Sequence, residues 1–67
     1  MDKLGRYLKE INYKFLMKRE EYYKGYNSTI ELTVDDEDIK NLKLYLTQKG
    51  YYVYNINNIL VITRYRN

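Results

Sequence analysis

The sequence predicts an α+β domain in which an N-terminal helix precedes a strand, a second helix and a β-hairpin. Residues 29–34 alternate between apolar and polar side chains, and residues 35–49 place apolar side chains at helical spacing. Residues 51–65 form two strand-like segments joined by Asn57 and Asn58. The strand-helix-strand connection makes the first two strands parallel, and the hairpin makes the third antiparallel to both. We therefore expect a βαββ unit with a three-stranded antiparallel sheet of order 1-3-2.

Length and composition predict one small domain over residues 1–67. A chain of 67 residues builds a core that is only marginally sufficient, and oligomerisation is a common supplement at this size. With no cysteine, the chain has neither disulfides nor thiolate metal ligands. No apolar run approaches the roughly 20 residues of a membrane span, and the first residues lack the apolar stretch of a signal peptide. We expect a soluble cytoplasmic protein with no membrane contact.

A helix is expected over residues 2–24. Asp2 suits the positive end of a helix, and Gly25 offers a left-handed stop. Lys18 interrupts the apolar stripe, and residues 11–17 also alternate, so a strand there is the alternative. The stripe consists of Leu4, Leu8, Ile11, Phe15 and Tyr22.

The next two elements are a half-buried strand and a second helix that ends at Gly50. The inward positions of the strand are Ile30, Leu32 and Val34. The inner stripe of the helix consists of Ile39, Leu42, Tyr45 and Leu46.

Four consecutive acids, Asp35 to Asp38, begin this helix. Asp35 or Asp36 is expected to cap it, and Glu37 and Asp38 suit the positive end of its dipole. No EF-hand spacing or turn glycine accompanies them. We therefore expect no metal and no cofactor.

The hairpin register follows from a two-residue turn at Asn57 and Asn58, which we expect to be type I′ with positive φ at both residues. Ile56 then faces Ile59. The further pairs are Tyr54 with Val61, Tyr52 with Thr63, Val53 with Ile62, and Asn55 with Leu60. One face is aliphatic and joins the core through Val53, Leu60 and Ile62. The other face carries Tyr52, Tyr54, Ile56, Ile59, Val61 and Tyr65.

Catalysis is not expected. The chain has no histidine or cysteine and no pair of carboxylates at a spacing that implies one pocket. Its three glycines are isolated, so no phosphate-binding loop is present. Tyr65 stands between Arg64 and Arg66 as a tyrosine nucleophile would require, but so short a chain has little room to enclose a substrate.

Ten tyrosines, beside one phenylalanine and no tryptophan, are the outlier of the composition. Tyrosine is amphipathic and enriched at interfaces, although coding from an AT-rich genome also explains an excess of tyrosine. We expect Tyr52, Tyr54 and Tyr65 to anchor a protein interface with Arg64 and Arg66 at its rim. The predicted function is a non-enzymatic protein-binding module that forms a homodimer.

Nucleic-acid binding is the alternative function, because aromatic side chains on an open sheet stack bases. Residues 1–24 also carry seven basic side chains against four acidic ones. Lys14, Lys18 and Arg19 form a possible second surface there, for nucleic acid or another partner. The glycine-aromatic runs and loops of the known sheet-based RNA modules are missing.

The ending from Gly50-Tyr51-Tyr52-Val53 through Ile59-Leu60-Val61-Ile62, with the small size and AT-rich composition, resembles small accessory proteins of bacteriophages and other mobile elements. The likeness covers roughly residues 30–65. It implies action without catalysis, by binding and inhibiting a host enzyme, a transcription factor or a defence complex such as a CRISPR effector. It implies a role for no single residue.

Overall fold

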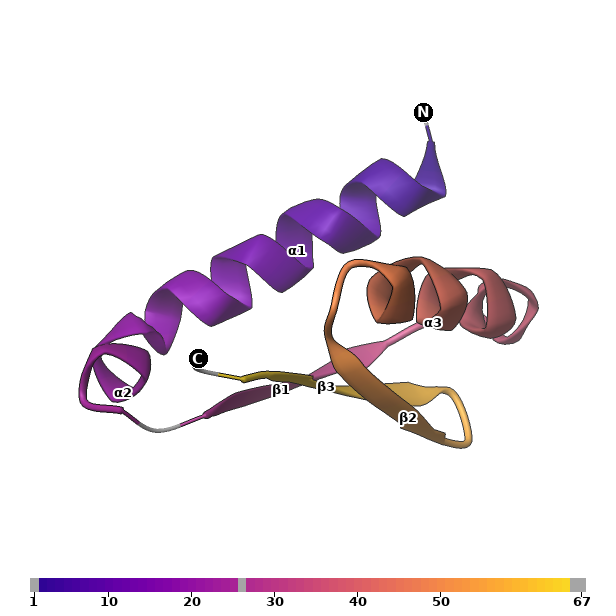
Figure 1. Cartoon of the computed structure of the whole chain (residues 1–67). Helices are drawn as coiled ribbons and strands as arrows, with labels where there is room; N and C mark the ends of the chain where they lie inside the picture. The colour runs from indigo at the N-terminus through magenta and orange to yellow at the C-terminus, as the bar shows by residue number, and fades with distance from the viewer. Residues whose placement is uncertain (1, 26, 66–67) are drawn as a thin grey trace.

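A computed structural model describes residues 2–25 and 27–65, and it confirms the predicted α+β order (Figure 1). The two longest helices lie on one face of a three-stranded sheet, and no described helix covers the other face (Figure 1). No described helix is long and apolar enough to cross a membrane. The elements are α1 (Lys3–Met17), α2 (Arg19–Tyr23), β1 (Ser28–Thr33), the short 3-10 helix η1 (Asp36–Asp38), α3 (Ile39–Gln48), β2 (Tyr52–Ile56) and β3 (Ile59–Arg64).

The sheet has the expected order β1-β3-β2, with β3 antiparallel to both neighbours. All five predicted hairpin pairs are confirmed, from Ile56 opposite Ile59 to Tyr52 opposite Thr63. In the middle of the sheet, Ile62 lies between Ile30 and Val53 on the two outer strands. The register therefore separates the two faces as the alternation predicted.

The predicted type I′ turn is wrong. Among the described non-glycine residues, only Asn57 has a positive φ, of 53°, whereas type I′ requires one at Asn58 as well. The backbone N–H of Val34 donates to the carbonyl oxygen of Asn58 at 2.8 Å, and the Asn55 side-chain amide donates to the carbonyl of Asn57 at 3.0 Å. The contact with Val34 lies outside the hairpin, so local turn preferences could not predict it.

The helix interpretation of residues 11–17 is confirmed, but the expected helix over residues 2–24 is interrupted at Lys18. There φ is −106° and ψ is 13°, and the Lys18 backbone N–H donates to the carbonyl of Phe15 at 3.0 Å. The side chain of Asp2 caps α1 by accepting from the Leu4 amide at 3.1 Å. Gly25, with φ of 97°, follows α2 as the predicted left-handed stop.

One hydrophobic core lies between the helices and the sheet. The predicted stripes face it: Ile11 and Phe15 from α1 and Leu42 and Leu46 from α3 are buried. The sheet contributes Ile30, Leu32, Val53, Leu60 and Ile62, and Val34 follows β1. From the sequence, the first helix could lie beside the second helix on the aliphatic face, cover the tyrosine face or reach another subunit. It lies on the same face of the sheet as α3, so the tyrosine-bearing face stays uncovered (Figure 1).

Candidate functional site

The uncovered side of the sheet carries three rows of side chains, each running from β1 across β3 to β2. We call these positions, together with Tyr65, the open face. The rows are Thr29-Thr63-Tyr52, Glu31-Val61-Tyr54 and Thr33-Ile59-Ile56. The β1 side is polar, and the β2 and β3 side is aromatic and aliphatic. The open face is therefore amphipathic across its width.

Three tyrosines that the sequence singled out lie together on the open face. The ring centroid of Tyr52 is 6.1 Å from that of Tyr54 and 6.3 Å from that of Tyr65, with interplanar angles of 59° and 62°. Tilted and edge-on contacts of this kind suit the aromatic quadrupole. Tyr52 and Tyr54 are 54 % and 43 % exposed, whereas Val61 beside Tyr54 is 6 % exposed. Val61 is therefore buried within this face, while the neighbouring tyrosine rings remain accessible to a partner.

Arg64 was expected beside these tyrosines, but it lies on the helix-covered face. Side chains alternate along β3, so Thr63 belongs to the open face and Arg64 points the other way. Its guanidinium lies over the ring of Phe15, 4.8 Å from the centroid, and over that of Tyr22 at 4.2 Å. Arg66, the other predicted rim residue, lies outside the described residues.

The charge of the open face distinguishes the two predicted functions. Glu31 is the charged residue on its strand positions, and no described position of the three rows carries a lysine or arginine. A base-stacking surface usually combines aromatic rings with cations that follow the phosphate backbone. The described part of this face has the rings without those cations.

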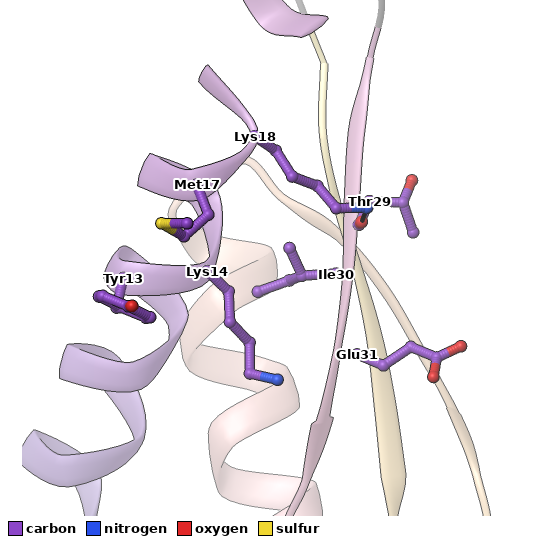
Figure 2. Close-up of a pocket in the computed structure, with 7 residues that line it drawn as sticks. All are labelled: Tyr13, Lys14, Met17, Lys18, Thr29, Ile30 and Glu31. Carbon is purple, nitrogen blue, oxygen red and sulfur yellow. Dashed lines mark hydrogen bonds between the residues drawn. The ribbon is translucent and has the colours of Figure 1, made fainter. Parts of the chain in front are cut away.

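A groove of about 580 Å³ separates the second half of α1 from the edge of β1 (Figure 2). Tyr13 and Met17 form its wall on the helix, and Ile30 points into it from the strand (Figure 2). Lys14 and Lys18 lie beside them, and the Lys18 ammonium donates to the backbone carbonyl of Thr29 at 2.8 Å. This contact from the end of α1 covers part of the exposed edge of β1, and covering an edge strand hinders its pairing with another chain.

The predicted second basic surface is therefore divided. Lys14 and Lys18 share the groove beside β1, while Arg19 lines separate hollows on α1 and α2. Lys18 is also committed to a structural hydrogen bond with the strand edge. The three side chains do not form one continuous cationic patch.

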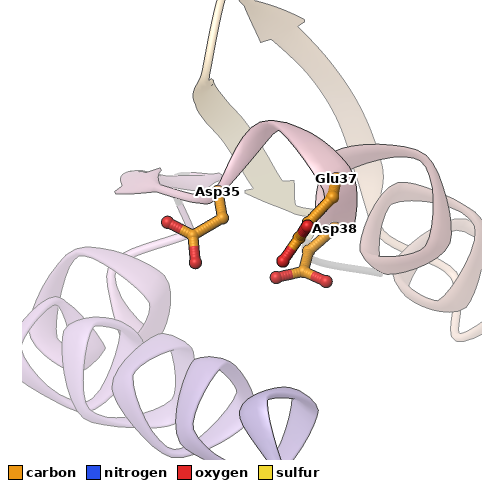
Figure 3. A group of neighbouring side chains, drawn as sticks. All are labelled: Asp35, Glu37 and Asp38. Atoms are coloured by element: carbon orange, nitrogen blue, oxygen red, sulfur yellow. The ribbon is translucent and has the colours of Figure 1, made fainter.

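The acid cluster at the start of α3 has a role that the sequence analysis missed. Ligand oxygens of Asp35, Glu37 and Asp38 lie within 4.8 Å of one another (Figure 3). The ammonium of Lys3 stands 2.9 Å from Asp35, 2.8 Å from Glu37 and 3.5 Å from Asp38. The cluster thus receives its cation from α1, and this contact ties the first helix to the start of η1.

Asp35, one of the two predicted caps, occupies the N-cap position of η1 with the other acids in the first turn, but its side chain makes no capping hydrogen bond. Neither Asp35 before η1 nor Asp38 before α3 makes a side-chain capping hydrogen bond. The carboxylates of Glu37 and Asp35 raise the pKa of Lys3, and Lys3 in turn holds the pKa of Asp35 below its ordinary value. Local sequence could not predict this ion pair, because Lys3 and Asp35 are 32 residues apart.

Tyr7 completes the attachment of α1 to the acid cluster. Its hydroxyl accepts from the Asp35 amide at 3.3 Å and donates to the Asp38 carboxylate at 3.0 Å. The amide contact lowers the pKa of Tyr7, but desolvation and the nearby carboxylate outweigh it, and the net pKa is raised. Tyr7 therefore serves as a structural hydrogen-bonding residue at this junction.

Comparison with protein-family models, with curated proteins and with solved structures finds no match for this chain. Its function has to be inferred from the chemistry of the surfaces described above.

Proposed function

We propose that this chain is a non-enzymatic protein-binding module that binds through its open face, with a second copy of itself as the first partner. The observation that carries the proposal is the uncovered cluster of Tyr52, Tyr54 and Tyr65 beside Ile56 and Val61. Large exposed apolar surface on a small domain commonly marks an interaction site. Tyrosine is suited to this role because its ring is buried on binding while its hydroxyl stays hydrated.

The charge of the open face supports a protein partner over nucleic acid. Its described strand positions offer an acidic side chain, Glu31, and no cation to contact phosphates. Arg64, the cationic side chain of β3, lies against Phe15 and Tyr22 on the covered side of the sheet. A mostly neutral apolar surface is also compatible with a copy of itself, because twofold packing then opposes few like charges.

The size of the open face sets the expected affinity. Three strands about 4.8 Å apart, each about five residues long, span roughly 14 by 17 Å, or ~240 Å² of flat sheet. A standard interface buries about 800 Å² on each partner. Interfaces this small are typical of weak or transient complexes, so we expect a weak homodimer.

The wider proposal is that the module inhibits a host enzyme or a defence complex, in the manner of bacteriophage accessory proteins. What supports it is the resemblance in size, AT-rich composition and C-terminal hairpin. The absence of histidine and cysteine from all 67 residues supports a binding role rather than a catalytic one.

Size-exclusion chromatography with light scattering tests the proposal over a range of protein concentrations. The wild type is expected to shift from monomer toward dimer as concentration rises. Tyr52→Ala with Tyr54→Ala is expected to remain monomeric while keeping its helical circular dichroism. The matched control is Tyr13→Ala with Tyr23→Ala, because both rings are exposed on the helices, away from the open face. A double mutant that dimerises like the wild type contradicts the proposal.

The same experiment, run with a pool of single- and double-stranded oligonucleotides, tests the alternative. Binding through phosphates weakens by orders of magnitude between low and moderate salt, whereas a tyrosine-centred interface changes little. A monomer that co-elutes with the oligonucleotides at low salt would replace protein binding with base stacking as the function of this face.

A further inference from the structure

Arg64 is held rigidly on the covered side of the sheet, at the end of β3. Its guanidinium carbon lies 4.2 Å from the ring centroid of Tyr22 and 4.8 Å from that of Phe15. Phe15 in turn stacks on Tyr51, with centroids 5.6 Å apart and an interplanar angle of 17°. These rings fix the plane of the guanidinium and leave its edge to form hydrogen bonds.

The charge of this guanidinium has no anionic partner in the described chain. Its Nε is buried and makes no hydrogen bond, and among residues 2–25 and 27–65 no carboxylate forms an ion pair with Arg64 or with Arg19. A guanidinium carries five donors and no acceptor, and a buried donor without a partner is costly. Cation-π contact with the rings stabilises the charge but satisfies none of these donors.

A pocket of about 260 Å³ opens beside Arg64, between α1, α2 and the sheet. Arg19 and Arg64 line it together with the side-chain amide of Asn12 and the rings of Tyr23 and Tyr51. No aspartate or glutamate is among its described lining residues. The pocket therefore combines the held guanidinium of Arg64 and the more exposed guanidinium of Arg19 with amide and hydroxyl groups that can donate further hydrogen bonds, and no described carboxylate lines it.

We propose that this pocket binds a phosphate monoester, with Arg64 and Arg19 contacting the phosphate oxygens. A monoester carries about −1.5 to −2 charges at neutral pH, which the two guanidiniums would compensate. The planar donor fork of arginine matches two phosphate oxygens at once. The aromatic rim and the pocket volume leave room for the organic group of the monoester. Inorganic phosphate presents the same oxyanion without that organic group. This site is distinct from the open face.

Amide and arginine NMR signals, followed during titration with phenyl phosphate at constant ionic strength, test the proposal. We expect saturable shifts in the signals of Phe15, Arg19, Tyr51 and the Arg64 side chain. Arg64→Gln is expected to weaken binding by about tenfold or more, because charge-assisted hydrogen bonds are lost. Arg6→Gln is the matched control, since it removes the same charge from an exposed position of α1 outside the pocket lining.

Arg19→Gln keeps the test decisive if Arg64→Gln fails to fold, because Arg19 is exposed on α2. It is also expected to weaken phenyl phosphate binding, with the Arg6→Gln variant unaffected. A parallel titration with inorganic phosphate separates the sources: tighter binding of phenyl phosphate indicates an organic monoester, and equal binding indicates the free anion. Shifts that do not saturate, or that weaken equally in Arg6→Gln, overturn the proposal.

Discussion

Replacing isoleucine by alanine should destabilise the protein independently of protein concentration on the covered face of the sheet, and more strongly at high protein concentration on the open face. Ile62 is 0 % exposed and lies at the centre of the covered face, between Ile30 and Val53. Ile56 is 56 % exposed, at the turn end of the open face. Both residues are in strands, so Ile62→Ala and Ile56→Ala lose the same atoms and a similar strand preference.

The magnitudes follow from burial. Ile62→Ala removes fully buried methyl groups and leaves a cavity, which costs about 2–5 kcal/mol. A domain of this length has a total stability of about 3–10 kcal/mol, so this variant should be close to unfolded or should melt at least about 8 °C lower. Ile56→Ala in the monomer loses about half of one side-chain transfer free energy and creates no cavity, which amounts to about 1 kcal/mol.

Urea denaturation followed by circular dichroism measures both effects, at low protein concentration and at a concentration where the wild type dimerises. Ile62→Ala should lose the same free energy of unfolding at both concentrations, because its contacts lie within one chain. Ile56→Ala should lose more at the higher concentration, because dimerisation stabilises the wild type by mass action. A large, concentration-independent loss for Ile56→Ala would show that the open face is covered within the monomer, and would refute the packing described above.

Two further predictions concern the acid cluster and the turn. Lys3→Gln should lower the melting temperature at neutral pH, because Lys3 holds the pKa of Asp35 below its ordinary value of 3.8. The difference from the wild type should be fully present above pH 3.8 and should disappear as the pH falls through the lower pKa that Asp35 has in the folded protein. An acid-insensitive difference would assign Lys3 a packing role instead. Asn57→Val should cost about 1–2 kcal/mol, because a β-branched residue resists a φ of 53°, whereas Asn58→Val should cost clearly less. Equal losses in urea denaturation would contradict this account of the turn.

Local pattern was sufficient to predict the elements and the two faces of the sheet. Alternation in β1 and the two-residue hairpin loop fixed which side chains pair and which share a face, since the side-chain period of a strand leaves only two choices. The tyrosines of the open face were found for the same reason. The helical stripe through Ile11 and Phe15 favoured a helix over the alternative strand, and the structure confirms the helix.

The same alternation could have placed Arg64 correctly. It is one residue after Thr63, which the predicted hairpin register assigns to the tyrosine face, so Arg64 belongs to the opposite one. The expectation that it stands beside Tyr65 treated neighbours in sequence as neighbours in space. Its position between Phe15 and Tyr22, and the pocket beside it, depend on the packing of α1 and α2 against β3.

The sequence by itself thus determined the order of the main elements, the register of the hairpin and the composition of each sheet face, because these depend on side-chain periodicity and short-range turn geometry. Only the tertiary structure decided that α1 joins α3 on the aliphatic face and leaves the tyrosines uncovered. It also decided that Lys3 pairs with Asp35, Glu37 and Asp38 and that Lys18 interrupts the helix beside Thr29. Each of these outcomes depends on contacts between residues far apart in the chain, whose free energies local preferences do not contain.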